Sequence, residues 1–205
     1  MKAKLFYIPC EKRLFIMSKD KVYKLKITIQ DIYPAIWREV LVPGGITFHK
    51  LHKIIQAAFG WQDYHLFLFL FPDCMVKEQD PDFPLHEIEK NPKKTYIDDL
   101  FEKHEKCLYE YDFGDSWMHE IIVEEVIGKP LENRSPVCIN GERHRPPEDV
   151  GGAGGYEYFL NVINDPNNPE YDEMLEWAEK DTGGRKFDPE YFYKNETNRK
   201  LKRIK

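Results

Sequence analysis

The chain has 205 residues, of which 41% are hydrophobic and 32% are charged. This composition excludes an intrinsically disordered chain, and the length suits one domain with a sizeable core. The 36 acidic residues outnumber the 30 basic ones and give a net charge of −6, which excludes a uniformly basic nucleic-acid surface and predicts at most weak binding of nucleic acid.

Cysteine spacing and hydrophobic runs bear on the location of the protein. The four cysteines form no C-x-x-C pair, which favours reduced thiols. The most apolar run, "HLFLFLF" at residues 65–71, is far too short to span a membrane. We therefore expect a soluble, cytoplasmic protein that has no membrane partner.

The sequence divides into three parts. Residues 1–16 differ in pattern from the residues after them, and Met17 resembles an ordinary protein start. We expect either an N-terminal arm upstream of the true start or, as the alternative, one additional strand. Residues 17–193 form the predicted domain, and residues 194–205 are predicted to be a solvated basic tail.

The first predicted elements are a hairpin and a helix. Residues 22–31 alternate apolar and polar side chains, as a half-buried strand does, and residues 36–43 are the antiparallel return strand. Thr47 is a suitable N-cap for a helix over residues 48–59, and Gly60 suits the position after its last turn.

The remaining elements complete the pattern. Residues 65–71 are apolar on both faces, which predicts a central strand covered above and below. Further strands are predicted at residues 107–112, 117–128 and 136–142, and helices at residues 156–164 and 170–180. Strands followed by helices indicate a single α+β domain with a mostly antiparallel sheet, a helix after the first hairpin and C-terminal helices.

Acid–base groups gather in the predicted hairpin around the turn "FGDS". Asp112, Asp115 and His119 are a donor set suited to a hard divalent cation or to acid–base chemistry, although their spacing is not that of a zinc motif. His119 shares a strand face with apolar neighbours, so the alternative is a core histidine bonded to a carbonyl or a tyrosine. Asp115 is better suited to forming the turn than to catalysis.

The segment "PPEDVGG", residues 146–152, is predicted to be a stiff acidic loop. It lacks the lysine and the spacing of a phosphate-binding loop. We predict that Glu148 and Asp149 pack beside the hairpin with a positive group between the two elements. Arg143 and Arg145 would make the contact a structural clasp, whereas a divalent cation would make it a site; a protonated His119 is a further candidate.

Aromatic residues surround the predicted first helix and the hairpin. They are Trp37, Trp61, Tyr64, His65 and Trp117. They are candidates for the wall of a pocket shared with the hairpin. The alternative is that they pack in the core.

Several long motifs resemble the plasmid pRiA4b ORF-3-like family. They are "IWREVLVPGGITFHKLHKIIQAAFGWQDYHLFLF", "YEYDFGDSWMHEI", "CINGERHRPPEDVGGAGGYEYFL" and "FDPEYF". The family is essentially uncharacterised and is loosely labelled resolvase-like. Similar members carry two cysteines in the loop where this chain has "HRPPEDVGG", so a cysteine-based metal or disulfide role is weakened here. Ser18, Ser116 and Ser135 lack the arginine-rich setting of a recombinase nucleophile.

The residues support two functional hypotheses. The first is a binding or interaction module with a protein partner, which the resemblance associates with plasmid or mobile-element biology. The second is a metal-dependent, hydrolase-like enzyme that uses the polar cluster, which comprises Asp112, Asp115, His119, Glu148 and Asp149. The sequence fixes no cofactor, and a divalent cation is the candidate.

Overall fold

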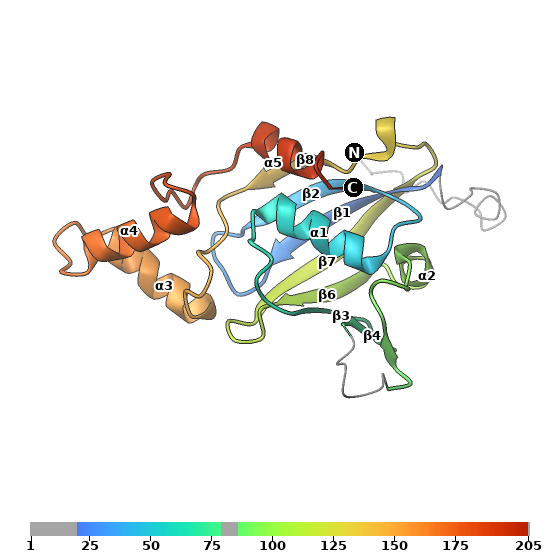
Figure 1. Cartoon of the computed structure of the whole chain (residues 1–205), viewed down its shortest axis with the longest axis horizontal. Coiled ribbons are helices and arrows are strands. Elements are labelled where there is room, and N and C mark those ends of the chain that lie inside the picture. The colour runs from blue at the N-terminus through green and yellow to red at the C-terminus, as the bar shows by residue number, and fades with distance from the viewer. Residues whose placement is uncertain (1–19, 79–85, 205) are drawn as a thin grey trace, which may run out of the picture.

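The computed structural model describes residues 20–78 and 86–204 (Figure 1). The expectations for residues 1–16 and for Met17 lie outside the described residues. A single sheet forms the centre of the molecule, and helix α1 lies across one of its faces.

The sheet has eight strands in the order β5-β4-β3-β6-β7-β1-β2-β8. The strands are β1 (Val22–Ile29), β2 (Trp37–Pro43), β3 (Phe67–Leu70), β4 (Met75–Lys77), β5 (Glu89–Lys90), β6 (Lys106–Tyr111), β7 (Trp117–Ile127) and β8 (Val137–Glu142). All neighbouring strands pair antiparallel except β4 and β5. The predicted mostly antiparallel α+β fold is therefore confirmed.

Helix α1 (Phe48–Phe59) covers the sheet as its sequence predicts. The backbone N–H of Lys50 donates to Thr47 Oγ1 at 3.3 Å, so Thr47 is the N-cap. Gly60 ends the helix with a left-handed φ of 88°, a conformation that glycine adopts without steric cost. The apolar stripe of α1, which includes Leu51 and Ile55, is buried against the sheet.

The other described helices lie later in the chain. They are α2 (Ile97–Phe101), the short 3-10 helix η3 (Glu132–Arg134), α3 (Gly152–Ile163), α4 (Tyr171–Asp181) and α5 (Lys194–Leu201). Helix α3 begins before the predicted residue 156, within the glycine run. A Cβ on Gly155 would lie 2.0 Å from the backbone oxygen of Val150, so only glycine permits this tight start.

Two expectations about burial are wrong. Strand β3 is covered on one face only: Phe67 and Phe69 are buried under α1, whereas Leu68 and Leu70 point to the other face and are half-buried. Residues 194–201 are not a solvated tail, because they form α5, whose Leu201 is 0% exposed.

Helix α5 also closes one edge of the sheet. The Asn198 side-chain amide donates to the backbone oxygen of Cys138 at 2.9 Å, and Asn198 Oδ1 accepts from the Cys138 backbone N–H at 2.8 Å. This pair satisfies at Cys138 the two hydrogen bonds that a further strand would make there, so α5 covers this part of the β8 edge.

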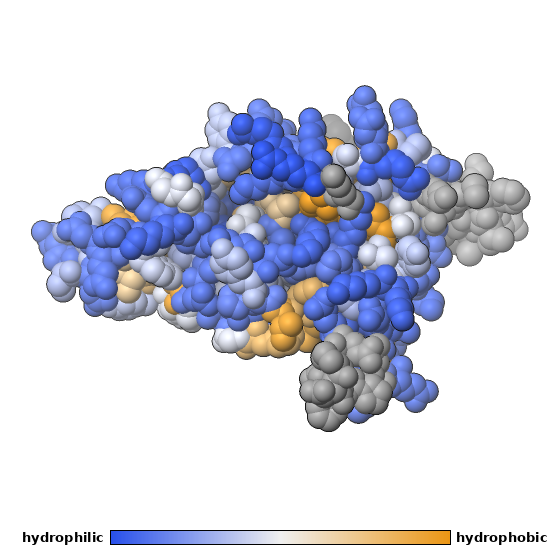
Figure 2. All heavy atoms as spheres, in the orientation of Figure 1, coloured by the Kyte–Doolittle hydropathy of each residue, from blue (hydrophilic) through white to orange (hydrophobic). Residues whose placement is uncertain are grey.

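The visible surface is mostly hydrophilic, with hydrophobic residues gathered at its lower edge near β3 (Figure 2). Across residues 20–78 and 86–204, no helix combines the length and the apolar character that crossing a membrane requires.

Candidate metal centre

The turn of the β6–β7 hairpin presents a carboxylate at one end of the sheet. Asp112 directly follows β6 with a left-handed φ of 59°, which aspartate tolerates better than most residues. Its Oδ1 accepts from the backbone N–H of Gly114 at 2.9 Å. Its own backbone N–H donates to the Leu66 carbonyl at 3.0 Å, which ties the turn to the segment before β3. Asp112 Oδ2 is therefore the oxygen left for another partner.

The acidic loop packs beside this turn, as the sequence predicts. The backbone N–H of Gly151 donates to Asp115 Oδ2 at 3.1 Å. A Cβ on Gly152, the first residue of α3, would lie 2.7 Å from the Asp115 backbone oxygen, so the approach requires glycine. The loop before α3 and the β6–β7 turn thus lie at the same end of the sheet (Figure 1).

His65 supplies the side chain that faces both elements. It precedes β3, and its Nε2 lies 3.6 Å from Asp112 Oδ2, 3.9 Å from Glu148 Oε2 and 3.3 Å from Asp149 Oδ1. Three carboxylates from two elements therefore converge on one imidazole nitrogen. We call these four residues the His65 centre.

Glu148 is the most buried carboxylate of the His65 centre, with 5% of its surface exposed. Its Oε1 accepts from the Gln62 backbone N–H at 2.7 Å and from the Tyr111 hydroxyl at 3.4 Å. Its Oε2 makes no hydrogen bond among the described residues, and neither does the buried Nε2 of His65. Burial raises the pKa of Glu148 above its ordinary value, although the Gln62 N–H and the nearby Arg145 oppose this.

The geometry suits a divalent cation. The ligand atoms of His65, Asp112 and Asp149 all lie within 4.8 Å of one another, and Glu148 Oε2 adds a fourth candidate. Two ligands that are each about 2.1 Å from one ion lie between about 3 and about 4 Å apart. The three distances from His65 Nε2 fall within this interval.

Two members of the predicted polar cluster lie outside the His65 centre. His119 is 0% exposed, its Nδ1–H donates to the Trp117 carbonyl at 2.8 Å, and its Nε2 accepts from Trp61 Nε1 at 3.3 Å. Burial lowers its pKa to about 4, so it is a neutral core histidine, which was the alternative prediction. Asp115 holds the turn against the loop by accepting from Gly151.

The two arginines do not form the clasp. Arg145 pairs with Asp181, with 2.8 Å between Nη1 and Oδ2, and lies 4.8 Å from the Trp61 ring centroid. Arg143 pairs with Glu190 at 2.8 Å. Both guanidinium groups are therefore engaged away from the hairpin, and the arginine version of the prediction is wrong.

The predicted aromatic group does not form one pocket wall. Trp61 and Trp117 are buried in the core with ring centroids 5.8 Å apart. Trp37 donates from Nε1 to Glu142 Oε2 at 3.1 Å near the opposite edge of the sheet. Tyr64 is exposed and donates its hydroxyl to Gln62. Of this group, His65 alone joins the carboxylates.

Sequence reasoning placed His65 among the aromatic residues rather than among the ligands. The missing information is the pairing of β3 with β6, in which Phe67 lies opposite Tyr111. A histidine two residues before β3 must then lie beside the residue that follows β6, which is Asp112. The sequence does show that His65 and Asp112 each flank a predicted strand. It does not show that these two strands are neighbours, because the order of strands in a sheet cannot be read from one sequence.

The comparisons agree with the resemblance and name no activity. The family model described as "Plasmid pRiA4b ORF-3-like protein" matches residues 21–196. The chain is 35% identical over 160 residues to the "Uncharacterized protein y4hQ" of Sinorhizobium fredii, covering 77% of this chain and 80% of that protein. It is similar to the crystal structure of the protein of unknown function MM3350 from Methanosarcina mazei Go1, with a TM-score of 0.74 and 36% identity over 85% of this chain and 96% of that one. The chain therefore belongs to the plasmid pRiA4b ORF-3-like protein family.

Proposed function

We propose that this protein binds a divalent metal ion at the His65 centre. The observation that carries the proposal is the pair of buried atoms, His65 Nε2 and Glu148 Oε2, that face each other at 3.9 Å and make no hydrogen bond among the described residues. A buried polar atom without a partner is costly, and a cation would satisfy both atoms together.

A protonated His65 is the competing source of positive charge. The Nε2 of an imidazolium donates one proton, and one proton cannot serve three carboxylates. The oxygens of Asp112, Glu148 and Asp149 all lie between 3.3 and 3.9 Å from that nitrogen, longer than an ideal hydrogen bond. A shared ion explains this even spacing better than a single hydrogen bond does.

The donor set favours a first-row transition ion. One imidazole nitrogen suits Zn²⁺ or Fe²⁺, and carboxylate oxygens suit Mn²⁺ and Mg²⁺. A mixed set of one nitrogen and three carboxylates can bind Mn²⁺, Fe²⁺ or Zn²⁺. Ca²⁺ prefers six to eight oxygen ligands, which the His65 centre does not offer among the described residues.

Hydrolysis is a second candidate function, favoured by the open side of the His65 centre. The side chain of Asp149 is 70% exposed, so solvent and a small substrate can reach this side of the centre, whereas His65 Nε2 and Glu148 Oε2 are buried. A bound divalent ion would supply Lewis acidity and would lower the pKa of water. In that reaction Glu148 would hold the ion through Oε2, because its Oε1 is fixed by the Gln62 backbone N–H.

We also propose a cellular context for the protein. The family description supports an association with plasmid or mobile-element biology, and a protein partner remains part of that proposal. A cytoplasmic location and at most weak binding of nucleic acid rest on the reduced-thiol pattern and on the net charge of −6.

Calorimetric titration of chelator-treated protein with Mn²⁺ and with Zn²⁺ tests the metal proposal. We expect one ion per chain, and we expect His65→Ala, Asp112→Asn and Glu148→Gln each to weaken the affinity at least tenfold, because each removes a ligand. His104→Ala is the matched control, since His104 Nε2 pairs with Asp73 at 3.0 Å elsewhere on the surface.

Two results would contradict the proposal. One is the absence of saturable binding of either ion by the wild-type chain. The other is an equal loss of affinity in His104→Ala and in His65→Ala, which would indicate scattered surface binding. Melting temperatures of the variants show that each one is folded before its affinity is compared.

A further inference from the structure

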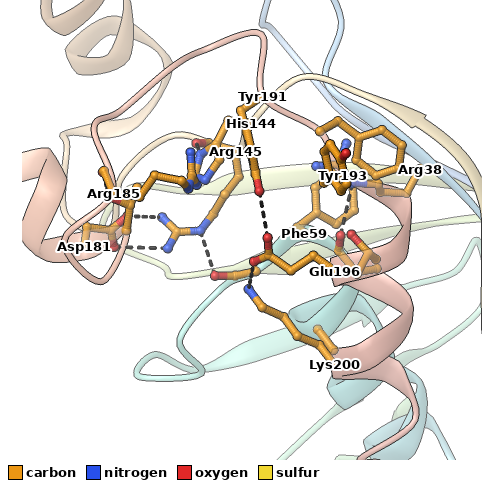
Figure 3. Close-up of a pocket in the computed structure, with 16 residues that line it drawn as sticks. Arg38, Phe59, His144, Arg145, Asp181, Arg185, Tyr191, Tyr193, Glu196 and Lys200 are labelled. Atoms are coloured by element: carbon orange, nitrogen blue, oxygen red, sulfur yellow. Dashed lines mark hydrogen bonds and ion pairs between the residues drawn. The ribbon is translucent and has the colours of Figure 1, made fainter.

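A cationic pocket lies between the end of α1, the loop after β8 and the segment that joins α4 to α5 (Figure 3). Its volume is about 90 Å³, several times the roughly 10–15 Å³ that one water molecule needs. Its basic lining comprises Arg38, Arg145, Arg185, Lys200 and His144. We call it the arginine pocket.

Arg38 is a buried cation in the wall of the arginine pocket, with 3% of its surface exposed. Its guanidinium donates to four backbone carbonyl oxygens, those of Trp37, Ala58, Glu142 and Arg143. It lies between the rings of Phe59 and Phe192, at 4.9 and 4.5 Å from their centroids. Burial lowers its pKa to about 10, so it stays charged at neutral pH.

The charge of Arg38 has no counter-ion nearby. Among the described residues, its guanidinium forms no ion pair with a carboxylate, and its hydrogen bonds all go to backbone oxygens. Backbone dipoles and aromatic faces stabilise the cation in part, but an unpaired buried charge remains costly. The pocket next to Arg38 therefore has a positive potential that an anion would offset.

Arg185 is the second cation of the arginine pocket that forms no ion pair with a carboxylate among residues 20–78 and 86–204. Its guanidinium lies 3.7 Å from the centroid of the Tyr191 ring, and its Nη1 is buried without a hydrogen bond. Arg145 differs, because it pairs with Asp181 at 2.8 Å. Arg185 thus holds a donor ready for a ligand that is not part of the described chain.

The charges that line the arginine pocket do not balance. Four cations, Arg38, Arg145, Arg185 and Lys200, face two carboxylates, Asp181 and Glu196, which leaves a surplus of two positive charges. His144 adds none at neutral pH, because burial, followed by the nearby arginines, lowers its pKa to about 4. The whole chain has a net charge of −6, so it does not attract anions in general. An anion bound at the arginine pocket would therefore be held by the local surplus of positive charge.

We propose that the arginine pocket binds a phosphoryl group, free or as part of an organic phosphate. A dianion matches the surplus of two positive charges, and a guanidinium bonds phosphate oxygens with two parallel N–H groups. The Tyr191 ring holds the Arg185 guanidinium in place, which limits the entropy lost on binding. The proposal is independent of the His65 centre, which uses different side chains.

Titration of chelator-treated protein with inorganic phosphate, and separately with adenosine monophosphate, tests this site. Chelator treatment removes metal, so failure here and failure at the His65 centre are distinguishable. We expect saturable binding that Arg185→Gln weakens about tenfold or more, since a charged hydrogen bond is lost. Lys202→Gln removes the same charge from an exposed position of the chain and should leave the affinity nearly unchanged.

Lys200→Gln provides a second variant in case Arg185→Gln is unstable, and we expect it also to weaken phosphate binding. Tighter binding of adenosine monophosphate than of phosphate would assign the site to organic phosphates, and equal affinity would assign it to the phosphoryl group alone. Absence of saturable binding by the wild-type chain would overturn the proposal. So would equal losses in Arg185→Gln and Lys202→Gln, which would reflect only the net charge.

Discussion

The hydrogen bonds of Glu148 distinguish a metal ligand from a purely structural carboxylate. Its two oxygens have different partners: Oε1 is fixed by Gln62 and Tyr111, whereas Oε2 points toward His65 and makes no hydrogen bond among the described residues. A purely structural carboxylate at 5% exposure would be expected to have both oxygens bonded. The one-sided bonding is the arrangement expected of a metal ligand whose second oxygen is fixed by the protein.

Histidine burial gives the molecule a predictable response to acid. Burial lowers the pKa of His119 from 6.5 to about 4. Between these pH values His119 is protonated in the unfolded chain and neutral in the folded chain. Its contribution to the free energy of unfolding is therefore complete above pH 6.5 and is lost as the pH falls toward 4. His119 alone contributes up to about 3 kcal/mol to this loss. His52 and His144, whose pKa values are also lowered to about 4, add to it.

Urea unfolding between about pH 7 and about pH 4.5 measures this effect. We expect His119→Gln to flatten the pH dependence of the unfolding free energy, whereas His86→Gln, at an exposed position, should not. Glu148 acts in the opposite direction, because its raised pKa lets the folded chain bind a proton more readily than the unfolded chain. An unchanged slope in His119→Gln would show that its imidazole is not held neutral in the fold.

Three elements bring the His65 centre together. The β6–β7 turn contributes Asp112, the loop before α3 contributes Glu148 and Asp149, and the segment before β3 contributes His65. Each is fixed by backbone hydrogen bonds: the turn to Leu66, the loop to Asp115. The carboxylates therefore depend for their positions on the contact between the turn and the loop, as well as on the sheet and on α3.

Helix α5 is an integral element, and its removal from the core should be costly. Leu201 is fully buried where α5 packs against α1 and β8. We expect Leu201→Ala to lower the unfolding free energy by about 2–5 kcal/mol, as other large-to-small substitutions in cores do. Lys202→Ala changes an exposed neighbour and should have an effect below about 0.5 kcal/mol. Equal effects of the two changes in urea unfolding would indicate that the segment is only loosely attached.

At the scale of the whole molecule, periodicity predicted the local elements well. The alternation in β1 and the capped, amphipathic pattern of α1 each appear at the expected residues. Helix α5 was missed because its buried positions, Thr197 and Leu201, form a narrow stripe in a sequence dominated by charge. The one-sided cover of β3 was missed because an apolar run does not reveal how many layers cover it.

The candidate site was predicted only in part, for a topological reason. The proximity of the hairpin and the "PPEDVGG" loop was expected from their charges, and Asp112, Glu148 and Asp149 were among the predicted residues. His119 was misplaced because strand alternation puts it on the covered face of the sheet, where α1 excludes water. His65 needed the strand order, and the arginine pocket needed the docking of α5, neither of which a single sequence contains.

The central claim is that the His65 centre binds a divalent ion, and anomalous X-ray diffraction from crystals grown with Mn²⁺ tests it most directly. We predict one strong anomalous peak about 2.0–2.3 Å from His65 Nε2 and from oxygens of Asp112, Glu148 and Asp149. We also predict that the peak is absent from crystals of Glu148→Gln grown in the same way. A map without a peak at these residues, or with Mn²⁺ bound only elsewhere, would contradict the account.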